Sequence, residues 1–280
     1  MPIDNWKIMV PWPLAETLIH LDLSTTTLRL VFSMLHQLDL AEVCGPSAPT
    51  EPPTIWASCA DLRARVGPRR PNGARDFHKA LTELLDTGLL VSGDLLNGNT
   101  NFQWRFAPWL WTHMRDRDWT NYVLVDLAEL GQCRFRFTLV LYIQMRKLHG
   151  SKAPQFLVAI NPERPIGPQI KQLTEAARRV ADILGVVCYI GLEHARHAPA
   201  PEHFLVKMTH PKTRWKKHAY LKFRANSQVW RVDLSGSRRF DPRSVSKMRA
   251  DLMAKGDAGL EHRVPDIGFL DSVETNRQPS

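Results

Sequence analysis

The order of hydrophobic patterns between residues 24 and 107 restricts this chain to few folds. The first pattern, STTTLRLVFSMLHQLDL, opens with Ser and Thr residues that suit a helix N-cap. Its apolar side chains recur at helical spacing from Leu28 to Leu38. This pattern predicts a buried core helix.

A strand and two further helices follow at short intervals. Residues 55 and 56 suit a short strand, and Ser58 with Asp61 fits the capping pattern at the start of a second helix. A third helix is predicted over residues 74–87. It is expected to end at Gly88, because glycine readily takes the left-handed conformation that follows many helices.

The segment LLVSGDLLNGNTNFQWRF predicts two strands joined around Asn97-Gly98. Helix, strand, helix, helix and hairpin is the element order of a winged helix. In that arrangement three helices bury a small core, the third turns a polar face toward the DNA major groove, and the hairpin reaches the neighbouring backbone.

The third predicted helix has a polar face that suits DNA contact. At 100° per residue, Arg75, Lys79, Thr82 and Asp86 fall within about 60° of one another, opposite the apolar residues. A solvated helix face is the alternative interpretation. Six residues of this unit are predicted to contact DNA. Arg69, Arg70 and Asn72, before the helix, are expected to bind the DNA backbone, and the outer face of the helix carries Arg75, Lys79 and Thr82.

A second set of patterns predicts another winged helix over residues 108–210. It contains the apolar helix RFRFTLVLYIQMRKLHG, a long helix over 169–184 and the strands VVCYIGLE and EHFLVKM. No separate middle helix precedes the long one. The outer face of the long helix mixes both charge signs, from Lys171 to Asp182, as intrahelical ion pairs do.

The positive charge of the chain is concentrated in one segment. From Leu205 to Lys255 there are fourteen Lys and Arg against three Asp and Glu, whereas the rest holds 23 basic and 25 acidic residues. Clustered Lys and Arg displace counterions condensed on phosphates, so nucleic acid is the predicted partner. An anionic membrane would require a basic amphipathic helix, and this segment lacks that pattern.

Within this segment, the stretch KTRWKKHAYLKFR, residues 212–224, is interpreted as a grip on the DNA backbone. A solvated surface is the alternative. Tyr220 lies on the polar side of a strand-like alternation and suits stacking on an unpaired base. The residues predicted to touch nucleic acid here are Arg214, Lys216, Lys217, Tyr220, Lys222, Arg224, Arg238 and Arg239.

The end of the basic stretch also carries strand periodicity. Phe223 falls on the inner side of residues 220–224, and VWRVDL, residues 229–234, alternates as well. The two segments predict a half-buried hairpin with Arg231 and Asp233 on its outer face.

These patterns together resemble the tandem winged-helix replication initiators of plasmids. The resemblance rests on the first helix, the capped second helix, ARDFHKALTELLDTGLLVS leading into a wing, and the later apolar helix, over roughly residues 20–210. It implies two winged helices that straddle repeated origin sequences, with Arg178 and Arg179 of the second giving most of the base reading. A transcriptional regulator on the same scaffold is the alternative.

Composition limits the compartment and the partners. Four widely spaced cysteines without a CxxC pair predict reduced thiols in a cytoplasmic protein. No signal peptide is expected, because the N-terminus lacks a basic segment leading into an apolar one. The expected partners are double-stranded DNA and melted single strands; a homodimer and host replication factors stay open, and no membrane partner or cofactor is expected.

Enzymatic patterns are weak, so the chain is predicted not to be an enzyme. Neither the H-x-H pair of a relaxase nor the H-x-x-R of a tyrosine recombinase occurs among the eleven histidines. No phosphate-binding loop precedes a helix. Two alternatives stay open: a zinc cluster of Cys188, His194, His197 and His203, and a magnesium site made from the dispersed carboxylates Asp61, Glu83 and Asp126.

The predicted fold is of the α+β class, mostly helical with small β-wings, and has two winged-helix domains in tandem. It consists of an N-terminal arm (1–23), a first winged helix (24–107), a second winged helix (108–210), a basic DNA-gripping extension (211–256) and a flexible C-terminal tail (257–280).

Binding to duplex DNA should depend strongly on salt. If the basic segment and the helix faces neutralise about 6 to 10 phosphates, affinity should fall on the order of a thousandfold or more between about 50 and 200 mM salt. Fluorescence anisotropy with a labelled duplex measures this fall. A flat salt response would contradict the electrostatic part of the prediction.

Overall fold

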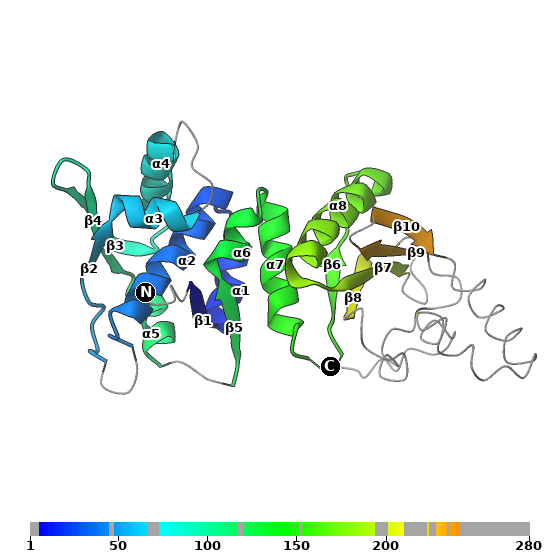
Figure 1. Cartoon of the computed structure of the whole chain (residues 1–280), viewed down its shortest axis with the longest axis horizontal. Coiled ribbons are helices and arrows are strands. Elements are labelled where there is room, and N and C mark those ends of the chain that lie inside the picture. Colours follow the sequence, from blue (N-terminus) through cyan, green and yellow to red (C-terminus); the bar gives the residue numbers. More distant parts are fainter. Residues whose placement is uncertain are drawn as a thin grey trace, which may run out of the picture. The chain divides into compact units, whose positions relative to one another are not determined.

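A computed structural model describes residues 6–44, 48–66, 73–116, 120–151, 153–193, 201–209, 223, 228–233 and 236–240. The chain divides into two compact units, Met1–Lys147 and Leu148–Ser280 (Figure 1). The predicted boundary between residues 107 and 108 therefore falls inside the first unit.

The elements of the first unit begin before the predicted winged helix and continue beyond it. They are β1 (Lys7–Pro11), α1 (Trp12–His20), α2 (Thr25–Leu40), β2 (Ile55–Ser58), α3 (Cys59–Val66), α4 (Gly73–Asp86), β3 (Leu90–Leu96), β4 (Asn101–Phe106), α5 (Pro108–Arg115), β5 (Tyr122–Asp126), α6 (Leu127–Gln132) and α7 (Arg136–Leu148), which ends at the unit boundary. From α2 to β4 the observed order is the predicted one.

Helix α2 is the core of the first unit. Its N-cap is Ser24, whose side-chain oxygen accepts a hydrogen bond from the Thr27 amide at 3.2 Å. Residues 27–36 are all buried, including the polar Arg29 and His36. They are buried because α3, α4 and α6 all pack against this helix.

Strands β2, β4 and β3 form a three-stranded antiparallel sheet with β4 in the middle. The inner face of β4 carries three buried aromatic rings, Phe102, Trp104 and Phe106. The first two stack with centroids 5.5 Å apart and ring planes 12° from parallel, and Phe106 meets Trp104 edge-on. These three rings make the inner face of β4 part of the core of the first unit.

Residues 7–20, which fall in the predicted N-terminal arm, are built into the first unit. Strand β1 pairs antiparallel with β5, and its Ile8 and Val10 are fully buried. Helix α1 buries Leu14 and Leu18 in the same way. The alternating apolar residues of this segment therefore form core rather than a free arm.

Helix α7 covers the second edge of β5. The Nε of Arg146 donates to the Leu124 carbonyl at 3.1 Å, and the Nζ of Lys147 donates to the Tyr122 carbonyl at 3.2 Å. Two carbonyls that do not pair with β1 thus find donors from side chains. Strand edges covered in this way are protected from pairing with other chains.

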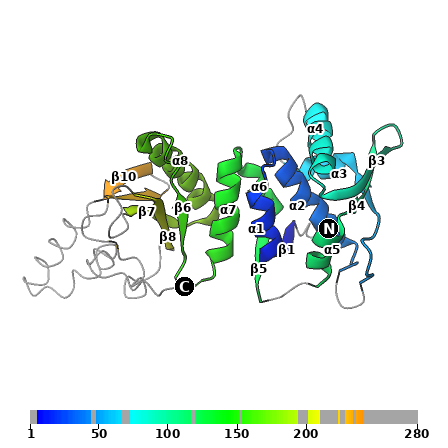
Figure 2. The ribbon, with the colours of Figure 1, turned by 180° about the vertical axis from the view of Figure 1, so that it is seen from behind.

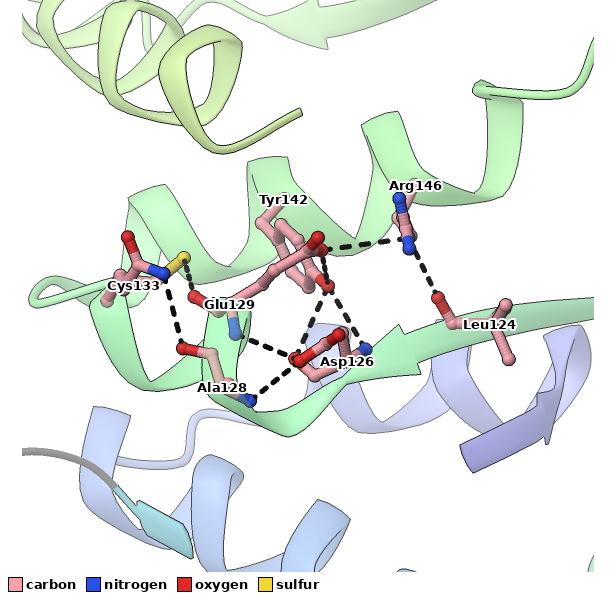
Figure 3. Close-up of polar contacts among 8 residues, drawn as sticks. Leu124, Asp126, Ala128, Glu129, Cys133, Tyr142 and Arg146 are labelled. Atoms are coloured by element: carbon pink, nitrogen blue, oxygen red, sulfur yellow. Dashed lines mark hydrogen bonds and ion pairs between the residues drawn. The ribbon is translucent and has the colours of Figure 1, made fainter. Parts of the chain in front are cut away.

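A partly buried polar network joins α7 to α6 and β5 (Figure 3). The hydroxyl of Tyr142 donates to Glu129 at 2.7 Å and accepts from the Asp126 amide at 3.2 Å, while Asp126 caps α6 through the amides of Ala128 and Glu129. Arg146 lies 3.8 Å from the same Glu129 carboxylate. Burial, reinforced by the hydrogen bond to Glu129, raises the pKa of Tyr142, so the hydroxyl stays protonated and donates.

The second unit is built on a five-stranded antiparallel sheet. Its elements are β6 (Gln155–Ala159), α8 (Ile166–Leu184), β7 (Val187–Glu193), β8 (His203–Thr209), β9 (Gln228–Asp233) and β10 (Gly236–Phe240), in the sheet order β10-β9-β7-β8-β6. Helix α8 packs against β7, β9 and β10 (Figure 2). It ends at Gly185, whose φ of 63° is the left-handed conformation typical of a glycine after a helix.

The predicted mostly helical, tandem winged-helix fold is wrong. Among its described residues the chain is α+β, with antiparallel sheets of two, three and five strands. The strands predicted as a second wing, β7 and β8, are instead central strands of the largest sheet, flanked by β9 and β6. Every residue of β8 from Phe204 to Thr209 is buried, and an exposed wing does not have this pattern.

The hairpin predicted between residues 220–224 and 229–234 is also wrong. Strand β9 pairs with β7 on one side and with β10 on the other, so both of its edges are occupied. The expectation that Arg231 and Asp233 share a face is confirmed, because the Arg231 Nε lies 3.2 Å from Asp233 Oδ2. Both side chains are half-buried rather than fully outward.

In the described part of the chain, no helix has the length and the apolar character needed to cross a membrane.

Removing the Tyr142 hydroxyl should destabilise the first unit. Tyr142→Phe leaves the Asp126 amide and the Glu129 carboxylate without this partner, so the free energy of unfolding should fall by about 1–3 kcal/mol. Urea denaturation followed by circular dichroism measures the change. Tyr122→Phe, on an exposed part of β5, is the control and should change stability by less than about 0.5 kcal/mol. Equal effects of the two substitutions would contradict the role of the network.

Candidate nucleic-acid interface

Helix α4 turns a polar face to solvent. Arg75, His78, Lys79, Thr82 and Asp86 are all exposed on it. Its buried side chains are Phe77, Ala80, Leu81 and Leu84. The predicted division of this helix into an apolar inner face and a polar outer face is confirmed except at Leu85, which was predicted to face inward and is 41% exposed.

The buried apolar face sets the rotation of α4, and a carboxylate between the two faces adds a polar contact to α2. Glu83 accepts a hydrogen bond from the Ser24 amide at 2.6 Å and another from the Thr27 hydroxyl. Both donors belong to the start of α2, where backbone amides lack partners within the helix and the helix dipole favours a negative charge. The contact therefore joins α4 to α2.

The pKa of Glu83 is lowered despite partial burial. Burial alone would raise it, but the hydrogen bonds from Thr27 and Ser24 and the charge of Lys79 together outweigh burial. Glu83 is therefore ionised at neutral pH. The negative charge strengthens the hydrogen bonds by which Glu83 connects α4 to α2.

The predicted contact residue Thr82 is exposed, but its hydroxyl already has a partner. It donates to the His78 carbonyl one turn earlier on α4, at 3.2 Å. Oxygen lone pairs and the methyl group are what Thr82 can offer a ligand. Arg69, Arg70 and Asn72 lie outside the described residues.

The outer face of the three-stranded sheet carries a residue that the sequence patterns did not single out for function. Trp56 on β2 is 69% exposed and lies directly opposite Gln103 on β4, which in turn pairs with Asp94 on β3. Large exposed aromatic side chains are typical of contact surfaces. The alternation of buried Ile55 and Ala57 around Trp56 is the sequence signal that places it outward.

The tip of the β3–β4 hairpin is polar and exposed. Asn97, Gly98 and Asn99 all have positive φ, from 53° to 69°, which matches the turn predicted around Asn97-Gly98. The tip carries no charge between residues 97 and 100. It suits hydrogen bonding to a partner better than a purely electrostatic contact.

Of the two arginines of α8 predicted to contact DNA, only one is fully exposed to solvent. Arg178 on α8 is exposed, whereas Arg179 is half-buried. Acidic side chains, including Glu175 and Asp182, share the exposed face of α8 with Arg178. The net field of this face is therefore weak.

Few cations of the basic segment lie in the described part of the chain. Arg239 on β10 is exposed, and Arg238 pairs with Arg231 in the β9–β10 register, but its side chain lies outside the description. Lys207 is buried. The predicted residues Arg214, Lys216, Lys217, Tyr220, Lys222 and Arg224 lie outside the described residues.

The proposed zinc ligands do not converge. Cys188 lies opposite Met208, whereas His203 lies opposite Glu193, so the two positions are about 17 Å apart along the strands. Burial raises the pKa of the Cys188 thiol to about 12, which disfavours the thiolate that binds metal. His194 and His197 lie outside the described residues.

Two of the three dispersed carboxylates have structural partners instead of a common metal site. Glu83 holds the start of α2, and Asp126 caps α6, while Asp61 is exposed on α3. Within the ranges that the structure describes, no group of three His, Cys, Asp or Glu side chains is placed to hold a metal ion.

The fold is similar to that of a DNA-bound initiator. A crystal structure of the Pi initiator protein in complex with iteron DNA matches with a TM-score of 0.53 and 12% sequence identity, over 75% of this chain and 99% of that one. Comparisons with protein-family models and with curated protein sequences found no match. The likeness shows a shared fold.

The Glu83 contact should make stability depend on acid. Because the folded-state pKa lies below the unfolded value of about 4.3, the ionised carboxylate stabilises the protein at neutral pH. This contribution should disappear as pH falls through the lowered pKa. Glu83→Gln should therefore be less stable than wild type at pH 7, by about 0.5–1 kcal/mol for this partly exposed group, and the gap should close below about pH 4.

Thermal or urea unfolding at several pH values measures this gap. Glu16→Gln on the exposed face of α1 is the control and should leave a small difference that does not vary in this way. A gap for Glu83→Gln that stays constant from pH 7 down to about pH 3 would contradict the assignment.

Proposed function

We propose that this protein binds specific sites in double-stranded DNA and starts replication of a plasmid or similar element from repeated origin sequences. The observation that carries the proposal is the fold likeness to the Pi initiator bound to iteron DNA, which covers nearly all of that chain. At 12% identity the likeness supports a shared scaffold, so the DNA-binding role rests also on the chemistry of this chain's surface.

The first unit has the element order and sheet of a winged helix, and α4 occupies the position of the recognition helix. An α-helix with its side chains is about 10–12 Å across, and the major groove is about 12 Å wide. Arg75 and Lys79 on the outward face suit guanine edges and phosphates. The hairpin, with its polar tip, suits contact with the adjacent backbone.

Charge supports a nucleic-acid partner for the second unit. The net charge between residues 205 and 255 is +11, against −2 for the remainder. Arg239 on β10 contributes to this positive field and is exposed in the described part of the chain. Such a focused field steers a polyanion and strengthens binding by counterion release.

The proposal places the protein in the cytoplasm, where an extrachromosomal element replicates, and has it act by binding rather than by covalent chemistry. Its four cysteines are free thiols, in accord with a reducing compartment. Origin opening would add melted single strands as a ligand. A homodimer and host replication factors are the further partners to test.

The decisive test of the function is selection of bound fragments from the source replicon. The proposal expects the recovered fragments to contain direct repeats next to an AT-rich tract, and expects the protein to increase the reactivity of that tract to single-strand probes. Recovery of a promoter site without repeats or opening would favour a transcriptional regulator. Covalently altered DNA that requires a divalent ion would favour an enzyme.

Replacement of Arg75 should reduce sequence discrimination. Arg75→Ala is expected to cost about 1–3 kcal/mol of binding free energy on the selected site and much less on random duplex. Arg115→Ala is the matched control. Arg115 is the last residue of α5 and pairs with Asp116, and α5 lies at the opposite end of the first unit from α4 (Figure 1). Equal losses on both duplexes would reassign Arg75 to the backbone.

A further inference from the structure

Gly191 leaves a notch in the five-stranded sheet. It pairs with Leu205 on β8 and with Val229 on β9, so the three positions share one face. Both flanking side chains are buried. A glycine inside a strand commonly marks a place where another group approaches the backbone closely.

The ring of Phe223 fills this notch. A Cβ atom added at Gly191 would lie 2.5 Å from both Cδ1 and Cε1 of the ring, far inside van der Waals contact. Phe223 is 1% exposed, although its neighbours in sequence, Lys222 and Arg224, are cations of the basic stretch. Its inward position agrees with the alternation predicted for residues 220–224.

A lysine on the same face also contacts the ring. The Nζ of Lys207 lies 4.7 Å from the ring centroid of Phe223, within the range of a cation–π contact. Lys207 pairs with Tyr189, which precedes Gly191 by two residues, so the contact comes from the adjacent row of the sheet. Phe223 is therefore held by apolar burial and by a cation.

Phe223 marks where the chain returns to the sheet it has just left. Strand β8 ends at Thr209, four residues beyond Leu205, which is the partner of Gly191. Thr209 and the notch are therefore on the order of 13 Å apart. The thirteen residues between Thr209 and Phe223 would span up to about 45 Å if extended, so both ends of this segment are fixed to one sheet.

We propose that Phe223 and Gly191 form a latch that anchors the chain to the second unit at the C-terminal end of the basic sequence 212–224, and that this anchor strengthens binding to DNA phosphates. The role in DNA binding rests on the proposed function. Phe223 is a positioning residue, since it is buried and acts through its charged neighbours. A segment fixed at both ends loses less conformational freedom on binding than one fixed at a single end.

The first experiment tests the latch without DNA. Full-length wild type and Gly191→Val, whose new side chain displaces the ring, are treated with trypsin, and cleavage after Arg224 is followed by mass spectrometry. The cleaved sequence is identical in both proteins. Cleavage at this site should be about tenfold faster in Gly191→Val, because it follows the population of the released state.

Gly167→Ala is the matched control. Gly167 lies on α8 in the same unit, and a Cβ added there meets nothing within 4 Å. This variant should be cleaved after Arg224 at the wild-type rate. Equal rates for wild type and Gly191→Val, with an unchanged circular dichroism spectrum, would overturn the latch.

The second experiment measures affinity for random-sequence duplex as a function of salt. Phe223→Ala and Gly191→Val should each bind about tenfold more weakly with an unchanged salt slope, because the same phosphates are contacted at a higher ordering cost. The triple variant Lys216→Ala, Lys217→Ala and Lys222→Ala should instead flatten the slope by about 3. Weaker binding with an unchanged salt slope reports loss of the anchor, whereas a flatter slope reports loss of the cations themselves.

The latch substitutions should not add. Phe223→Ala combined with Gly191→Val removes one contact from both sides, so the double variant should bind no more weakly than either single variant. If Gly191→Val or Phe223→Ala fails to fold, Phe223→Leu keeps apolar bulk in the notch and should show smaller changes in the same direction.

The failures of the two proposals are distinguishable. Wild-type affinity in the latch variants, with faster cleavage after Arg224, would overturn the role of the latch in DNA binding. A wild-type protein that binds no duplex at low salt would overturn the proposed function, and the cleavage rates would still decide whether the latch exists.

Discussion

One carboxylate, that of Glu83 on α4, accepts from the Ser24 amide, which helix α2 cannot satisfy internally, and from the Thr27 hydroxyl. With Glu83 held there, the 3.6-residue period of α4 turns Phe77 into the core and Arg75 toward solvent. The proposed reading face thus depends on the apolar packing of α4 together with the Glu83 contact, and the lowered pKa of Glu83 keeps that carboxylate ionised at neutral pH.

In the second unit the requirement is different, because both faces of the central strands must be shielded from water. Helix α8 packs against β7, β9 and β10, and Phe223 closes over Gly191 on the face that also carries Lys207. The residue that covers the sheet belongs to the most cationic stretch of the chain. Burial of one aromatic ring therefore links the stability of the sheet to the proposed anchor of the basic sequence 212–224.

Local patterns were sufficient for most of the first unit and insufficient for the second. Helix α2 with its Ser24 cap, the capped α3, α4 ending before Gly88, and the hairpin at Asn97-Gly98 all depend on contacts within a few residues, so the sequence predicts them. The five-stranded sheet depends on pairings such as β9 with β7, between residues that are far apart along the chain and carry no local signal. For the candidate site, the outward face of α4 was predictable from periodicity, whereas the Glu83 contact and the Gly191 notch require the tertiary structure.

The proposed function stands on α4 entering the major groove of a repeated site. A photo-crosslinking residue at position 79, in place of Lys79, reports this contact in the full-length protein bound to its selected fragment, with position 16 on the exposed face of α1 as the control. The expected result is crosslinking from position 79 to bases at one fixed place in each repeat, and none from position 16. Crosslinks from position 79 that are absent, or that spread evenly over the fragment, would contradict the proposal that α4 reads the sequence.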